Sequence, residues 1–415
     1  MAAALRWVLL PWLGLIGAFL AWNEYHTLRV LDWQDFDGSR EQLEERQPWG
    51  GLSGRALAVA ADEILGLEPE RMEALLAWQL PNYPLDPNRW LARALNAHQA
   101  GECPDRVLDF ARVAQAVQPG HRDVQWQVAL LAEELGRPEH AEQALRAFLQ
   151  DHPGGTRRAL ALAAQWIEDP ADLIERILPE GEDHLLAAMD FARSETWIGL
   201  AVAVWQRLAL PRAPDDRGLL DFVDLMLDQD FPDFAMFAWW QNFPDYEPGT
   251  VPNADFQHAL EAGRALHWRT RTPKGVRAVR DLRTFVTEPG SLRLDFEGVE
   301  NVNLHGAHLQ LRIPVLAGPQ RWRLSGYWKA ENVTTGSRPR LWLSAGQGRA
   351  VHAELPAPTL DWTPFELDIE TSGGLDVLTL QIRRAPVRIA FDRDIAGRLW
   401  LDALRLEPLD LEPEA

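Results

Sequence analysis

Two segments near the C-terminal end, 321–329 and 340–344, alternate apolar with polar or aromatic residues. Tyr327 in the first segment and Trp342 in the second stand at outward positions among arginine and serine residues. A period of two is typical of strands with one buried face. An exposed ring can stack on the apolar face of a sugar, while guanidinium and amide groups bind hydroxyl or carboxylate oxygens. The two segments therefore predict a surface that recognises carbohydrate.

The candidate site extends over the neighbouring predicted strands. Its arginines suit an acidic glycan, since a guanidinium group binds carboxylates in pairs of hydrogen bonds. A solvated outer face, or a face covered by other parts of the chain, would have the same composition. Trp322 and Trp328 lie on the opposite face and are expected in the core. The candidate ligand-binding residues are Tyr327, Trp342, Arg312, Arg323, Arg340, Gln381 and Arg383.

Alternating segments fill residues 269–408, separated by glycine and proline. This spacing predicts an antiparallel β-sandwich. About 140 residues suffice for the two packed sheets of a jelly roll. The predicted strands are 292–296, 309–313, 322–328, 341–343, 363–369, 378–382 and 399–406, with a first strand within 269–279.

The order of these segments resembles the jelly-roll carbohydrate-binding modules of the cellulose-binding CenC type. The resemblance runs from Gln-Arg-Trp-Arg-Leu-Ser-Gly-Tyr-Trp-Lys-Ala at 320–330 to Leu-Trp-Leu-Asp-Ala-Leu-Arg-Leu at 399–406. It implies glycan binding and a structural calcium near the closing strand. Asp402 occupies the corresponding position, and Asp392 and Asp394 could add the oxygen ligands that calcium prefers. An exposed acidic turn is the alternative for these three residues.

Residues 53–268 have a period near 3.6 and predict a domain of paired helices, the last over 254–266. Gly101 recurs 35 residues later as Gly136, and Pro119 recurs after 34 residues as Pro153. This spacing resembles the tetratricopeptide repeat, over about residues 85–153. Such a domain offers a docking face for a partner protein or acts as a spacer. Both interpretations stay open.

Residues 7–22 are almost wholly apolar, and this run predicts a single membrane-spanning signal anchor over 5–22, with a cleaved signal peptide as the alternative. Arg6 before the segment and acidic residues after it place the N-terminus in the cytoplasm. The bulk of the chain is then expected in the periplasm of a bacterium, joined to the inner membrane through a linker over 23–52. Residues 409–415 form an acidic tail.

Composition excludes several classes of function. The net charge is −20, with the acidic excess in residues 1–268, which argues against nucleic acid. The single cysteine, Cys103, excludes an internal disulfide. No nucleophile elbow, phosphate-binding loop or zinc-protease motif occurs, so no enzyme activity is expected.

The predicted fold class is multidomain α plus β: a transmembrane helix, a helical solenoid similar to tetratricopeptide repeats, and a C-terminal sandwich. The predicted function is a non-catalytic envelope protein that presents a glycan-binding sandwich and assists exopolysaccharide or O-antigen assembly. Expected partners are a bacterial polysaccharide, envelope polysaccharide-assembly proteins, or both. The alternative is a protein–protein scaffold whose sandwich binds no sugar.

Overall fold

The computed structural model describes residues 69–409 apart from 83, 151, 259, 261–262, 271–274, 299–308, 317, 319–320, 335–337, 347, 355–358 and 385–393. The chain divides into two compact units, Met1–His184 and Leu185–Ala415. The boundary lies inside a helix, so the last helices belong to the same unit as the strands.

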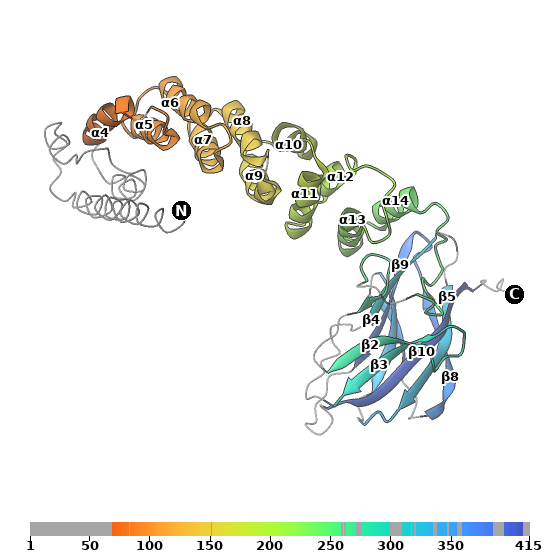
Figure 1. Ribbon diagram of the computed structural model, residues 1–415. Helices are drawn as coiled ribbons and strands as arrows, with labels where there is room; N and C mark the ends of the chain where they lie inside the picture. The colour runs from red at the N-terminus through yellow and green to blue at the C-terminus, as the bar shows by residue number, and fades with distance from the viewer. Residues whose placement is uncertain are drawn as a thin grey trace, which may run out of the picture. The chain divides into compact units, whose positions relative to one another are not determined.

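The first unit is built from short antiparallel helices (Figure 1, orange to yellow). Proline stands in the first turn of several of them, where its missing N–H has no helical partner to lose. The helices are α4 (Pro69–Asn82), α5 (Pro87–Gln99), α6 (Pro104–Val117), α7 (Arg122–Glu134), α8 (Pro138–Leu149), the 3-10 turn η2 (Pro153–Gly155), α9 (Thr156–Ala163), α10 (Pro170–Ile177) and α11 (Glu182–Ser194), which crosses into the second unit.

Two hairpins, α5–α6 and α7–α8, repeat one turn geometry. Gly101 ends α5 at φ 75° and Gly136 ends α7 at φ 65°. The residue after each glycine donates its N–H to the carbonyl five residues earlier, at 2.9 and 2.8 Å. Glycine closes a helix in this left-handed conformation without the strain of a Cβ. The glycine spacing therefore repeats a structural unit, as the sequence predicts.

The second unit adds three helices to the sandwich: α12 (Ile198–Trp205), α13 (Arg217–Asp228) and α14 (Pro232–Asn242). The ten strands found in the described residues form two five-stranded antiparallel sheets. Sheet A has the order β1-β4-β9-β6-β7, and sheet B has the order β2-β3-β10-β5-β8. The strands are β1 (Arg269–Thr270), β2 (Val276–Asp281), β3 (Ser291–Glu297), β4 (Leu309–Val315), β5 (Arg321–Glu331), β6 (Pro339–Ala345), β7 (Arg349–Glu354), β8 (Thr359–Glu370), β9 (Asp376–Arg384) and β10 (Ala396–Pro408).

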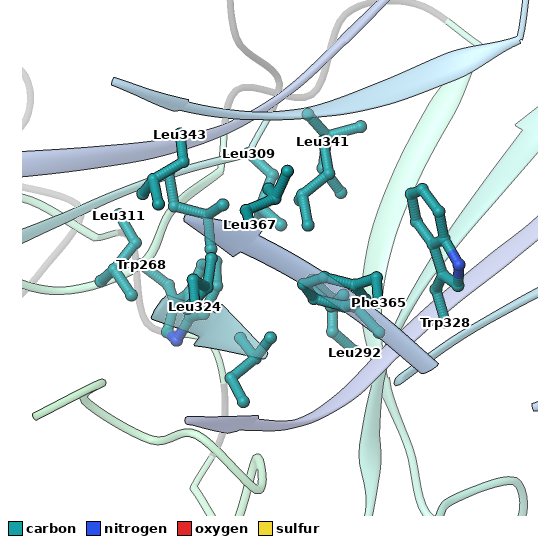
Figure 2. Close-up of a cluster of buried hydrophobic side chains, with 14 of the residues drawn as sticks. Trp268, Leu292, Leu309, Leu311, Leu324, Trp328, Leu341, Leu343, Phe365 and Leu367 are labelled. Carbon is teal, nitrogen blue, oxygen red and sulfur yellow. The ribbon is translucent and has the colours of Figure 1, made fainter. Parts of the chain in front are cut away.

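One apolar core fills the space between the sheets. Figure 2 shows leucines of β4 and β6 in sheet A beside leucine and phenylalanine side chains of β5 and β8 in sheet B. Along β5 the side chains alternate between buried and solvent-facing. Trp322 and Trp328 are buried in this core, which confirms their predicted position.

Two features of the second unit differ from the sequence prediction. The residues described within 254–266 form turns and irregular chain instead of the predicted helix, and Phe256 packs into the sandwich core. The apolar spacing of this segment comes from its contacts with the sandwich. Strand β7 is an additional edge strand, which alternation missed because none of its six residues is buried.

The predicted fold class includes a membrane-spanning helix, and this part of the prediction is wrong. In the part of the chain that the structure describes, no helix is long and apolar enough to cross a membrane. The longest described helices, α4 and α6, have 14 residues. At 1.5 Å per residue they extend about 21 Å, against roughly 30 Å of bilayer hydrocarbon. The predicted anchor over 5–22 and the linker over 23–52 lie outside the described residues.

The predicted location in the inner membrane depends on that helix, so it is corrected as well. A single-pass inner-membrane protein with a periplasmic body depends on the anchor, and no described helix provides one. The supported fold class is a set of paired helices followed by an antiparallel two-sheet sandwich.

Candidate functional site

Sheet A brings five of the seven predicted ligand residues to one surface. Strand β4 carries Arg312, β6 carries Arg340 and Trp342, and β9 carries Gln381 and Arg383. All five alternate with buried core residues and are half-buried on the outer face. β9 lies between β4 and β6, so residues far apart in sequence become neighbours.

A row of side chains crosses this face through the strand register. Gln310 pairs with Gln381, Gln381 with Trp342, and Trp342 with His352. Strands about 4.8 Å apart make this row roughly 14 Å long, enough to contact more than one sugar ring. Amide donors and acceptors therefore lie beside an aromatic ring along one line.

Trp342 is held on two sides. The His352 ring stacks on it with centroids 4.7 Å apart and an interplanar angle of 23°. The Arg383 guanidinium carbon lies 5.7 Å from the ring centroid. Such neighbours fix the orientation of an indole and reduce the entropy lost when a ligand binds.

A polar groove of about 380 Å³ continues from Gln381 over the same face. Its floor is outward-facing residues of β4, β6 and β9, including Gln310, Thr379 and Ser344. Its wall is the turn between α13 and α14, with Asp228 and Asp230. The floor can form many hydrogen bonds, whereas the aromatic ring that can contact a ligand, Trp342, flanks the groove.

Buried ion pairs hold α13 against the sandwich. Asp224 on α13 accepts hydrogen bonds from Arg269 at 3.0 Å, Arg264 at 3.0 Å and the Ala265 N–H at 2.8 Å. Arg312 of β4 reaches the same carboxylate at 3.4 Å. Several donors around one buried carboxylate offset the cost of removing it from water.

The arginines of this surface are paired with protein groups. Arg312 pairs with Asp228 as well as Asp224, and Arg340 pairs with Glu354. Arg383 lies over the Trp342 ring. The positive charge that suited an acidic glycan is therefore largely neutralised by neighbouring carboxylates.

Tyr327 and Arg323 lie on the outer face of sheet B, across the core from Trp342. Tyr327 is 38% exposed. Arg323 donates two hydrogen bonds to Asp368, at 2.7 and 2.9 Å. The Arg323 guanidinium holds the pKa of the Asp368 carboxyl below its usual range. These two residues are not brought together with the other five.

Asp402 is fully buried on β10 and joins this strand to the loop before β3. One carboxylate oxygen accepts from the N–H groups of Val286 at 2.6 Å and Thr287 at 3.0 Å, and the other accepts from Ala403 at 2.6 Å. N–H dipoles that point at a carboxylate repel a cation, so Asp402 does not fit a calcium ligand. Asp394 is exposed, and Asp392 lies outside the described residues.

Among the residues that the structure describes, no group of three or more His, Cys, Asp or Glu side chains is placed to hold a metal ion.

The ligand-binding residues proposed from the sequence leave out four residues of the site: Gln310 and His352 in the row, and Asp228 and Asp230 in the wall. Alternation places Gln310 outward, which is a usable signal. His352 lies on the edge strand that the pattern did not predict. In the sequence, Asp228 and Asp230 look like the ordinary end of a helix, because no local pattern indicates that this turn lies over a sheet.

Comparison with known proteins finds partial likenesses to solved structures. No family profile and no curated protein matches the chain. The chain is similar to the CBM22-1 xylan-binding domain of Paenibacillus barcinonensis Xyn10C, at 17% identity over 37% of this chain and 94% of that chain, with a TM-score of 0.23. It is similar to a CBM4 structure, at 13% identity over 38% of this chain and 99% of that chain, with a TM-score of 0.26.

The chain is also similar to PilF of Pseudomonas aeruginosa, a tetratricopeptide-repeat protein. The identity is 21% over 43% of this chain and 84% of that chain, with a TM-score of 0.24. The similar structures thus include carbohydrate-binding domains and a tetratricopeptide-repeat protein.

Proposed function

We propose that the outer face of sheet A binds a glycan chain without transforming it. The observation that carries this proposal is the Trp342 ring, oriented by His352 and Arg383 beside the amide of Gln381. A sugar that contacts the rim of the indole beside Gln381 would direct its hydroxyl groups at Gln381 and into the polar groove. The floor offers both donors and acceptors, which hydroxyl groups require.

The full chain is tested by affinity electrophoresis in gels that contain soluble neutral polysaccharides: hydroxyethyl cellulose, barley β-glucan, arabinoxylan or pullulan. We expect at least one polymer to retard the protein. Trp342→Ala should weaken that retention roughly tenfold or more, the scale of a central aromatic anchor. An unchanged melting temperature would show that the substitution acts on binding.

Tyr327→Ala is the matched control, since it removes an exposed ring from the opposite sheet. It should leave retention unchanged. If Tyr327→Ala abolishes binding and Trp342→Ala does not, the ligand binds sheet B, and the proposed site is wrong.

A protein-contact function is the second candidate, favoured by three exposed phenylalanines at three-residue spacing in and before α14. Phe231, Phe234 and Phe237 are 41%, 47% and 59% exposed. Exposed apolar patches mark interaction surfaces. This function predicts retention by no polymer, and a loss of self-association in sedimentation velocity for the double variant Phe234→Ser/Phe237→Ser but not for Trp342→Ala.

A further inference from the structure

The turn between α13 and α14 is built as a fixed wall. Phe231 donates its N–H to the carbonyl of Met226 at 2.8 Å, which closes the end of α13. Asp230 stands at φ 62°, and Pro232 begins α14 directly afterwards. A helix end locked on one side and a proline on the other leave this turn little conformational freedom.

The wall is also fixed against the sheet that it covers. Asp224, one helical turn before Asp228, is buried among Arg264, Arg269 and Arg312. Asp228 itself pairs with Arg312 on the floor of the groove. The position of the turn over β4 is therefore set by a cluster of charge pairs around the buried Asp224 carboxylate.

The groove between this turn and the sheet carries an excess of negative charge. Among the residues that the structure describes, its charged lining consists of the carboxylates of Asp228, Asp230 and Asp376 and the guanidinium of Arg312. Asp376 accepts hydrogen bonds from Ser372, and Arg312 is engaged by Asp228. An anionic sugar that entered here would meet unfavourable potential, because like charges at close range repel in a partly desolvated site.

We propose that the turn Asp228–Pro232 forms part of the glycan site, and that Asp228 and Asp230 select neutral chains and exclude acidic ones. This inference rests on the proposed glycan binding. It makes the helices of the second unit part of the recognition surface, with Asp224 as a positioning residue. It also reverses the preference that the arginines suggested in the sequence.

The test is affinity electrophoresis of the full chain in gels that contain one of two forms of the same polymer. One form is a neutral polysaccharide that retards the protein, and the other is the carboxymethyl derivative of that polysaccharide. Wild type should bind the neutral form better. Asp230→Asn should lower the ratio of neutral to acidic retention about threefold to tenfold, the scale of one like-charge contact at the protein surface. Asparagine tolerates the left-handed backbone, so the turn should keep its shape.

Asp233→Asn is the matched control, because Asp233 is an exposed carboxylate in the first turn of α14 and does not line the groove. It should leave the difference unchanged. Raising the salt concentration to 1 M should lower the ratio of neutral to acidic retention for wild type, since salt screens charge repulsion. The same ratio for Asp230→Asn should change less.

The outcomes separate the two proposals. Retention by no polymer overturns glycan binding, and this inference with it. Retention of the neutral polymer with equal or stronger retention of the acidic form overturns only the charge selection. The charge selection is also overturned if Asp230→Asn and Asp233→Asn change the ratio of neutral to acidic retention by the same amount.

Discussion

The buried carboxylate of Asp402 illustrates how single side chains hold this sandwich together. It accepts three backbone hydrogen bonds from residues of its own strand and of the loop before β3. Asp281 acts similarly at the other end of that loop, accepting from Arg283 N–H, Arg293 and the Trp400 indole. Burial alone would raise the pKa of Asp281, but these donors lower it below the usual range. Both carboxylates fasten one loop over sheet B.

Asp402→Asn is expected to lower the free energy of unfolding by about 1–3 kcal/mol, the cost of leaving a buried hydrogen-bonding group unsatisfied. The amide has one acceptor oxygen, and its NH₂ group would face a backbone N–H. Urea denaturation measures the change. Asp394→Asn, at an exposed position, is the matched control and should differ little from wild type.

Calcium provides a second measurement on Asp402. Added calcium should leave the melting temperature of wild type unchanged, because the Asp402 oxygens are occupied by N–H donors. A rise that Asp402→Asn abolishes would contradict the structural role and restore the calcium site.

At the scale of elements, strand β5 has to pass close to its neighbours. Gly326 lies on its inward face between Trp322 and Trp328 in the alternation. A Cβ at this position would approach Leu404 Cδ2 to 2.8 Å and Phe365 Cζ to 3.0 Å. The missing side chain therefore makes room for the Phe365 ring, which packs against Trp328 with centroids 5.4 Å apart.

Gly326→Ala should destabilise the second unit by about 1–3 kcal/mol, as overpacking of a dense core does. Thermal unfolding measures the loss. Gly346→Ala is the control in the same sandwich, since a Cβ there meets nothing within 4 Å. Equal stability of the two variants would show that the core accommodates a Cβ at position 326 without loss of stability.

At the scale of the whole molecule, the sandwich depends on chain segments that precede its first strand. Phe256 and Trp268 are buried in the sandwich core, and the Trp268 indole donates to the Pro252 carbonyl at 2.9 Å. The compact unit correspondingly begins at Leu185 rather than at β1.

A fragment of residues 185–415 is therefore expected to unfold cooperatively, whereas residues 269–415 should melt more than about 10 °C lower. Loss of a buried phenylalanine or tryptophan costs roughly 3–5 kcal/mol, and the shorter fragment lacks both. Differential scanning calorimetry compares the two. Equal melting temperatures would show that the strands form a self-sufficient domain.

Elements with a local residue pattern are predictable from the sequence alone. Alternation along 321–344 identified two strands and placed Trp322 and Trp328 in the core, because successive side chains of a strand face opposite ways. The recurrence of Gly101 as Gly136 marked two equivalent helix ends, because the left-handed conformation favours glycine.

Which outward residues share a surface depends on the tertiary fold. β9 lies between β4 and β6, which unites Arg312, Gln381 and Trp342, while Tyr327 faces away on the other sheet. The partner of Arg312, Asp228, stands 84 residues away, so no spacing rule connects them. Sheet order and ion pairing depend on contacts between distant segments, and these set both the shape of the groove and the sign of its charge.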